Sequence, residues 1–395
     1  MRISTLTFQS DALSQMDALQ SEMATTQNQL ATGKKLNSAA DDPAGMAQVN
    51  LLNNQLSAST QYVTNGNYAS ANLQLEEQAM SDATNLLQSA RDLAVQANNS
   101  ALTATQRQDI ASQLQQQLQD LVAIGNRTDS DGNYLFAGTS NRTQPFAQLG
   151  SSVSYSGAAN VSQVQISSNQ RISSGDTGAS VFMNVPAGNG TFVTAVGAAN
   201  TGSASIGPGT VTDAGAWVPD TYTIAFSSPT QYQVTNSSGT VITSGTYADG
   251  GSIAFNGIQV AINGTPASAD RFTVTPAGTA SAFSTLSSLV TTLSNPNLSS
   301  AQLTTQMGGA LQQIDAAITN LNNVSASVGA RLNSITSSQS SAQSTQTNLQ
   351  QSISQLSDVD YAAAITQLNT QELSLQAAQE SYASIAKLSL FNYIQ

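Results

Sequence analysis

The sequence contains no cysteine and no histidine among its 395 residues. The missing cysteine excludes disulfides, thiolate nucleophiles, zinc fingers and iron–sulfur clusters. The missing histidine excludes Ser–His–Asp and Cys–His centres and histidine metal ligands. The enzyme chemistry that remains is that of paired carboxylates, as in glycosidases.

Charge is sparse and mostly negative. Only 9% of the residues are charged, and 11 Lys and Arg stand against 23 Asp and Glu, which gives a net charge of −12. The basic residues are scattered and cannot neutralise a run of phosphates, so we expect no nucleic-acid partner. Apolar runs are far shorter than the roughly 20 residues that a spanning helix needs, so we expect no membrane insertion. The first residues, MRISTLTFQSDALSQ, lack the apolar region of a cleaved signal peptide.

Composition changes twice along the chain. Residues 1–130 are rich in Gln, Ala, Leu, Asn and Asp, the stretch 142–282 in Gly, Thr, Ser and Val, and the remainder returns to the helical composition. We therefore predict an α+β fold: an elongated molecule whose N- and C-terminal arms form long antiparallel helices and a coiled coil, with an inserted all-β domain. The predicted domains are a terminal helical coiled-coil core (1–42 and 357–395), a helical bundle with a short β-hairpin (43–141 and 283–356), and a β-rich outer domain in one or two lobes (142–282).

The C-terminal arm has the clearest periodicity. Apolar residues recur every seven positions, which predicts one long helix in a coiled coil or bundle: Ile314, Leu321, Val328, Ile335, Ala342, Leu349, Leu356 and Ala363. The N-terminal arm supplies matching partners such as Leu73, Met80 and Leu87. Helix boundaries are predicted from capping signals: Gly33 as a C-cap, Asp42–Pro43 and Asp358 at helix starts, and Thr103 with Gln106 as a capping box.

Short alternating runs in the middle predict antiparallel strands, separated by Gly, Pro and Asn-Gly turns. They are 153–155, 164–166, 222–226, 232–234, 253–255, 260–262 and 272–274.

Motifs that could carry chemistry have simpler explanations. Asp129-Ser-Asp131-Gly132 places its glycine wrongly for a calcium loop, so we interpret it as a turn leading into a strand at 134–136. The carboxylate pairs Asp41/Asp42, Glu76/Glu77 and Asp358/Asp360 are explained by capping or polar helix faces. We expect no enzyme activity, no cofactor and no metal.

The terminal arms are too short to pay for their own ordering, because burying about eight apolar side chains gives roughly 12–24 kcal/mol against about 30–60 kcal/mol of backbone entropy. We therefore expect them to order on assembly. The candidate interface comprises Leu13, Met16, Met23, Leu30, Ile365, Leu368, Leu375, Tyr382 and Ile385, with Leu390 and Phe391 from the terminal stretch. An ordinary intramolecular core is about as good an explanation for any one of them.

Four motifs carry a family resemblance. They are MRIST at the start, LATGKKLNSAADDPAG at 30–45, GNYLFAG at 132–138 and SLFNYI at 389–394. On these motifs the chain resembles the flagellin superfamily, and within it the hook-associated protein 3 (FlgL-type) junction family. The resemblance is strong in both arms. The middle region resembles the family only in its general type.

The resemblance implies a structural subunit that is exported unfolded through the flagellar type III channel. It implies an extracellular location at the hook–filament junction of the bacterial flagellum, where the subunit joins others in a ring. The implied partners are flagellin, a hook-side junction protein of the hook-associated protein 1 type, other copies of this chain, and an export chaperone of FlgN type at the C-terminal helix.

Two other interpretations stay open. Flagellin itself or the first hook-associated protein would share the arms but take a different position in the polymer, and flagellin would polymerise into long filaments. An extracellular adhesin would display the β domain on a helical stalk, but it would need a cleaved signal or an anchor, which the sequence does not suggest.

Overall fold

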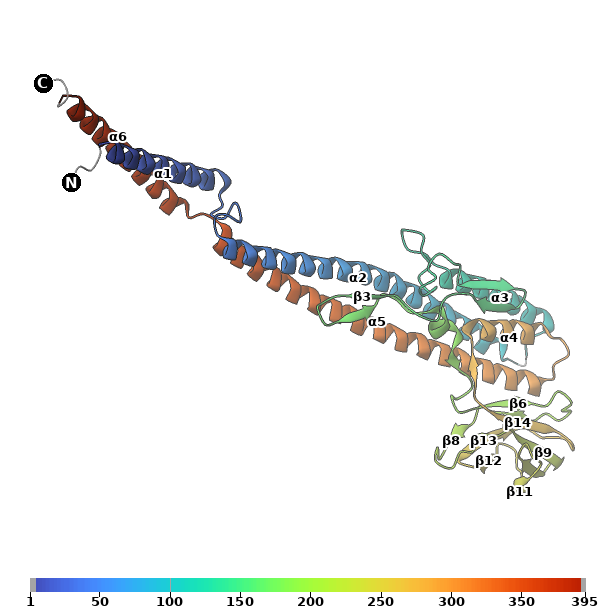
Figure 1. The fold of residues 1–395 in the computed structure, drawn as a ribbon. Coiled ribbons are helices and arrows are strands. Elements are labelled where there is room, and N and C mark those ends of the chain that lie inside the picture. Colours follow the sequence, from blue (N-terminus) through green and yellow to red (C-terminus); the bar gives the residue numbers. More distant parts are fainter. Residues whose placement is uncertain (1–4, 100, 392–395) are drawn as a thin grey trace. The chain divides into compact units, whose positions relative to one another are not determined.

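The computed structural model describes the backbone of residues 5–99 and 101–391, and the side chains of 7, 9–99 and 101–384. Long helices dominate both ends of the chain, and strands occupy the middle (Figure 1). The helices are α1 (Thr5–Thr32), α2 (Pro43–Ala97), α3 (Ala104–Gly125), α4 (Ala282–Ser294), α5 (Ser300–Ser357) and α6 (Tyr361–Phe391), with a π-helical turn η1 (Ala179–Met183).

The described strands pair antiparallel throughout. The main sheet has the order β11-β10-β9-β14-β6, and a second has β12-β13-β7 with β8 also on β13. The pairs β1-β2, β3-β4 and β5-β15 are separate. The strands are β1 (Phe146–Leu149), β2 (Ser152–Tyr155), β3 (Gln163–Gln165), β4 (Arg171–Ser173), β5 (Val185–Pro186), β6 (Phe192–Val196), β7 (Ser205–Ile206), β8 (Thr210–Val211), β9 (Tyr222–Ser228), β10 (Gln231–Thr235), β11 (Val241–Thr246), β12 (Ser252–Phe255), β13 (Ile258–Asn263), β14 (Arg271–Pro276) and β15 (Thr279–Ala280).

The chain folds into two compact units, residues 1–64 with 338–395 and residues 65–337, and both α2 and α5 contribute to each. The domain boundaries derived from composition stay a prediction. Unit 1–64/338–395 contains α1 and α6, whereas unit 65–337 contains α3, α4 and the strands.

Helices α2 and α5 run antiparallel. In unit 65–337 the Arg91 guanidinium binds Asp315 at 2.7 Å, and in the other unit Ser59 Oγ donates to the Ala342 carbonyl at 3.3 Å. Of the predicted heptad row, Ile314, Leu321, Val328 and Ile335 are at most 1% exposed, and Ala342, Leu349 and Leu356 are half-buried on the same helix. The last predicted position, Ala363, is exposed and lies on α6, beyond the end of α5. The long helix predicted from this periodicity is therefore confirmed.

Unit 65–337 has two separate hydrophobic cores. The helical core combines α2, α3, α4 and α5 with side chains from residues 136–185. It contains a cluster of aromatic rings in which the Phe146 centroid lies 4.8 Å from that of Phe283 and 5.7 Å from that of Phe182. The second core lies between the two larger sheets and is built from residues 192–274. Residues 142–186, although strand-like in sequence, therefore pack on the helices.

Every strand predicted from alternation is present. The strand predicted at 134–136 after the Asp129 turn is absent, and Tyr134 forms only an isolated bridge with Thr128. Asp129 closes this turn by accepting from the backbone N–H of Asp131 and Asn133 at 2.9 and 2.8 Å. The turn predicted there is thus correct, and the strand after it is wrong.

Most of the predicted caps are confirmed. Asp42 Oδ1 accepts from the N–H of Ala44 and Gly45 at 3.0 Å, and Thr103 forms a capping box with Gln106. The prediction for α6 is wrong by two residues. Its first turn is capped by Asp360, which accepts from the N–H of Ala362 and Ala363.

Candidate assembly surfaces

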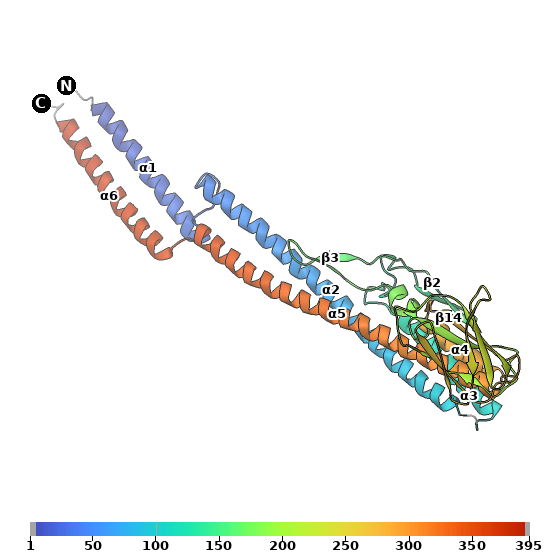
Figure 2. The ribbon, with the colours of Figure 1, turned by 90° about the horizontal axis from the view of Figure 1, so that it is seen from below.

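Helices α1 and α6 pack against each other along alternating three- and four-residue steps, the spacing of a coiled-coil seam. The two helices lie side by side in Figures 1 and 2. The seam positions, all buried or half-buried, are Ala12, Met16, Leu19, Met23, Thr26 and Leu30 on α1, and Ala364, Leu368, Gln371, Leu375, Ala378 and Tyr382 on α6. This pairing explains why two weakly apolar helices form here.

The predicted interface residues separate into two groups. Six of them lie half-buried in the α1–α6 seam: Met16, Met23, Leu30, Leu368, Leu375 and Tyr382. Leu13 and Ile365 lie beside the seam and are 48% and 50% exposed. Ile385, Leu390 and Phe391 fall on α6 but outside the described side chains. Six of the residues thus contribute to pairing within the chain, and the contact of any of them with another subunit stays a prediction.

The terminal helices carry further exposed apolar side chains that the interface prediction did not include. Tyr361 is 54% exposed and Leu373 is 69% exposed. On α2, the side chains of Tyr68 and Leu75 are also exposed and lie seven residues apart, so they share one face. Large exposed side chains grouped on helix faces are typical of surfaces that other proteins cover.

A buried polar pair sits within the α1–α6 seam. Thr26 Oγ1 donates to Gln371 Oε1 at 3.0 Å, and the two residues are 3% and 6% exposed. The hydroxyl also lies 3.0 Å from the Glu22 carbonyl. Sequence reasoning missed this pair because it considered apolar positions only. The seven-residue step from Ala364 to Gln371 was the available signal.

The connection between α1 and α2 is bound to the connection between α5 and α6. Lys35 N–H donates to the Ser357 carbonyl at 2.6 Å, and Val359 N–H donates to the Gly33 carbonyl at 3.0 Å. Gly33 has φ +70°, and a Cβ there would lie 2.8 Å from the Tyr361 hydroxyl. Residues of the motif LATGKKLNSAADDPAG therefore connect α1 to α2, and backbone hydrogen bonds hold this connection against the one between α5 and α6.

Carboxylates in this connection have structural roles. Asp41 Oδ2 accepts from the N–H of Ser38 and Asn37 at 2.8 and 3.0 Å, and these bonds lower the pKa of Asp41. Hydrogen bonds from the hydroxyls of Ser354 and Ser357 lower the pKa of Asp358. Each acid is thus bound as an anion to groups that hold the backbone in place.

The β-sheets attach to the helices through polar contacts with α5. Gln313 accepts from the Gly188 N–H at 3.1 Å and donates to the Pro186 carbonyl at 3.2 Å. Thr305 Oγ1 accepts from the Ile206 N–H at 3.1 Å. Because the two hydrophobic cores share no residues, these hydrogen bonds orient the β region on α5.

Among the residues that the structure describes, no three or more Asp or Glu side chains are grouped to hold a metal ion. Within residues 5–99 and 101–391, no helix has both the length and the apolar character that a bilayer span requires. The exposed apolar side chains on the helix faces are features of the kind that bind other protein chains.

Three protein families match separate parts of the chain. Residues 3–141 match the bacterial flagellin N-terminal helical region, and residues 311–394 match the bacterial flagellin C-terminal helical region. Residues 196–276 match the D2-like domain of flagellar hook-associated protein 1. Different family models therefore match the helical arms and the β region.

Individual proteins agree with these matches. The chain is 31% identical over 185 residues to flagellar hook-associated protein 3 of Salmonella typhimurium, a stretch that covers 47% of this chain but only 58% of that protein. Among solved structures, FlgL of Xanthomonas campestris is 30% identical with a TM-score of 0.71, and the match covers 77% of this chain and 99% of that one. The junction protein FlgL of Legionella pneumophila is 31% identical with a TM-score of 0.68, covering 73% and 99%.

Proposed function

The chain belongs to the FlgL family of flagellar hook-associated proteins, and we propose that it is a structural subunit that joins the hook of the bacterial flagellum to its filament. The observation that carries this proposal is the exposed apolar surface beside the α1–α6 seam. Leu13, Tyr361, Ile365 and Leu373 are 48–69% exposed. They lie on helices that match the terminal helical regions of flagellin.

Covering these four side chains would favour assembly. Full burial of one large apolar side chain is worth about 1.5–3 kcal/mol, so covering the exposed half of four contributes on the order of 3–6 kcal/mol per subunit. That range is enough to favour packing against a neighbour once the helices are held in place. We propose that the neighbours are other copies of this chain in a ring, flagellin on the filament side, and a hook-associated protein 1 type subunit on the hook side.

We further propose that the protein works outside the cell, at the hook–filament junction, after type III export. Before export, an export chaperone of FlgN type would cover the apolar face of α6 that Ile365 and Leu373 expose. The role is mechanical and needs no catalytic step. The hydrogen-bonded attachment of the β region to α5 suits a surface module added to a helical assembly core.

A seeded assembly assay tests the junction role. The purified chain is added to hook fragments capped with a hook-associated protein 1 type subunit and, separately, to filament fragments, and growth is followed by light scattering and electron microscopy. We expect the chain to bind the capped hook ends, to stop after a limited addition, and to permit flagellin to add afterwards. Long filaments of this chain alone would instead identify a flagellin, and no binding to either end would favour an adhesin.

Variants test which surface is responsible. Ile365→Ser and Leu373→Ser should each weaken addition to hook ends by about 1 kcal/mol per side chain, or roughly fivefold in affinity. Leu149→Ser is the matched control, because Leu149 is 86% exposed in the β1-β2 hairpin, far along the sequence from the terminal helices. Equal losses for all three variants would contradict the assignment of α6 to the interface.

Substitutions by glutamate at two of these positions test the chaperone proposal. Leu373→Glu should reduce co-elution of the full chain with the FlgN-type chaperone in gel filtration, whereas Leu149→Glu should not. If Leu373→Glu binds the chaperone as well as the unaltered chain does, the exposed face of α6 is not the chaperone site.

A further inference from the structure

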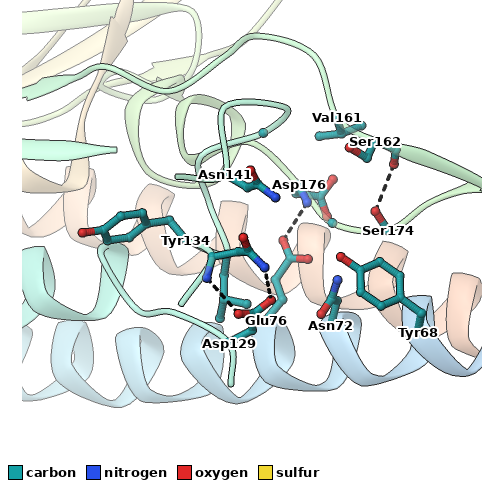
Figure 3. A pocket seen from close by; sticks show the side chains of 14 residues that line it. Tyr68, Asn72, Glu76, Asp129, Tyr134, Asn141, Val161, Ser162, Ser174 and Asp176 are labelled. Carbon is teal, nitrogen blue, oxygen red and sulfur yellow. Dashed lines mark hydrogen bonds between the residues drawn. The ribbon is translucent and has the colours of Figure 1, made fainter. Parts of the chain in front are cut away.

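A buried acid in the helical core has no role in the proposed assembly. Glu76 on α2 is 1% exposed and lines a cavity of about 60 Å³ (Figure 3). Its Oε1 accepts from the Asp176 N–H at 3.0 Å. Among the described residues, Oε2 has no hydrogen-bond partner. A carboxylate in this position would therefore leave one charged oxygen buried and unpaired, which is costly.

The nearby cation compensates Glu76 only in part, because the charge of Arg331 lowers the pKa of Glu76 by less than burial and the charge of Asp176 raise it. Arg331 on α5 forms its ion pair with the Asp176 carboxylate, and it also donates to the carbonyls of Gly175 at 3.1 Å and Ser173 at 3.5 Å. The cluster thus contains two acids and one guanidinium. If both acids were ionised, the buried cluster would carry one uncompensated negative charge.

The other titratable groups around the cavity do not supply a positive charge. Tyr68 comes from the same helix as Glu76, and Asp129 and Tyr134 come from the turn that faces it. Asp129 is already bound by the N–H of Asp131 and by Asn133. The cavity is roomy enough for water, which needs about 10–15 Å³. A neutral carboxyl can be accommodated there without a protein partner.

We propose that Glu76 keeps its proton in the folded protein at neutral pH, and that the 173–178 segment is held on α2 and α5 less strongly as pH rises, because its release lets Glu76 lose this proton. The segment is held on one side by Glu76 and on the other by Arg331. It leads directly into η1, whose Phe182 belongs to the aromatic cluster of the helical core. Glu76, Asp176 and Arg331 therefore form a lock that depends on a single proton.

The direction of the pKa shift agrees with this geometry. Burial, and then the negative charge of Asp176, raise the pKa of Glu76 from 4.5 to about 8. Between pH 4.5 and about pH 8, the protein with the 173–178 segment bound to the helices holds more protons than the protein with the segment released. The free energy that favours the bound segment therefore falls as pH rises. The effect starts above pH 4.5 and is complete above about pH 8.

Hydrogen exchange compared between the full chain and Glu76→Gln tests the lock, because the amide keeps the shape and cannot ionise. We expect exchange of a peptide covering 171–178 in the unaltered chain, relative to Glu76→Gln at the same pH, to rise about 70-fold between pH 5 and pH 7 and about tenfold more between pH 7 and pH 9. Glu77→Gln is the matched control, since Glu77 is bonded to Ser325 instead. Parallel pH dependence in the chain and in Glu76→Gln would overturn the proposal.

Infrared spectroscopy tests the protonation state without relying on a variant that folds. An ordinary aspartate or glutamate in water is ionised at pH 7, so the proposal predicts an absorption band of a neutral carboxyl at pH 7 that disappears on titration to pH 10. Absence of the band at pH 7 would overturn the proposal. Loss of the band on adding Ca²⁺ at pH 7, with stabilisation of the segment, would also overturn it, because the cavity would then be a cation site.

Discussion

Replacing Thr26 by Val removes the hydroxyl that binds Gln371 in the α1–α6 seam but keeps the shape of the side chain. Gln371 is 6% exposed, so its Oε1 would lose its donor without gaining water. Leaving one buried acceptor unsatisfied costs about 1–3 kcal/mol. We expect Thr26→Val to weaken the pairing of α1 and α6 by this amount.

Replacing Gln371, the other partner of this hydrogen bond, should behave differently. In Gln371→Leu the Thr26 hydroxyl still has the Glu22 carbonyl at 3.0 Å, so no buried polar group is orphaned. Replacing a buried amide by an apolar side chain of similar size is then close to neutral or stabilising. The double variant should recover most of the loss caused by Thr26→Val, because both polar partners are gone.

Hydrogen exchange of peptides from α1 and α6 measures these effects locally. A loss of 1–3 kcal/mol corresponds to exchange about 5- to 150-fold faster, since about 1.4 kcal/mol is a factor of ten. Thr25→Val is the matched control, because the Thr25 hydroxyl is exposed and bonds only to the Ser21 carbonyl of its own helix. Equal losses for Thr26→Val and Gln371→Leu, or an effect of Thr25→Val as large, would refute the reasoning.

Three further substitutions test the scaffold. Phe146→Ala removes a fully buried ring and should cost about 3–5 kcal/mol in denaturant unfolding; a cost below about 1 kcal/mol would contradict the packing. Gly33→Ala places a Cβ at φ +70° beside Tyr361, so it should cost about 1–2 kcal/mol and speed hydrogen exchange in the 33–36 connection. Asp42→Ala removes the α2 cap and should cost about 1 kcal/mol, seen as faster exchange in the first turn of α2 only; unchanged exchange there would show that the cap adds nothing.

The helices were predictable because their signals are local. The heptad repeat through Ile314 and Leu321 needs only neighbouring residues to be recognised, and the Thr103–Gln106 capping box closes within four residues. Alternation predicted the strands for the same reason. The Asp358 cap failed because Asp358 and Asp360 are equally good capping residues, and only the pairing of Lys34 with Asp358 decides between them.

The candidate surfaces were predictable only in part. Periodicity placed Met16 and Leu13 on the same apolar side of α1, although Met16 is half-buried in the seam and Leu13 is 48% exposed. The two positions differ by less than one helical turn. Which of them contacts α6 depends on how the two helices are rotated about their own axes when they pack. The sequence of α1 alone does not encode that rotation.

By itself, the amino-acid sequence determined the helical arms, the strands of the middle region, most of the caps and the family resemblance, because each depends on short-range spacing or on contiguous motifs. The tertiary structure decided which polar residues are buried together. Thr26 and Gln371 are 345 residues apart, and Asp176 and Arg331 are 155 apart. Their interactions depend on desolvation and on close approach of distant segments, so only the folded chain could show that one carboxyl oxygen of Glu76 is buried without a hydrogen-bond partner.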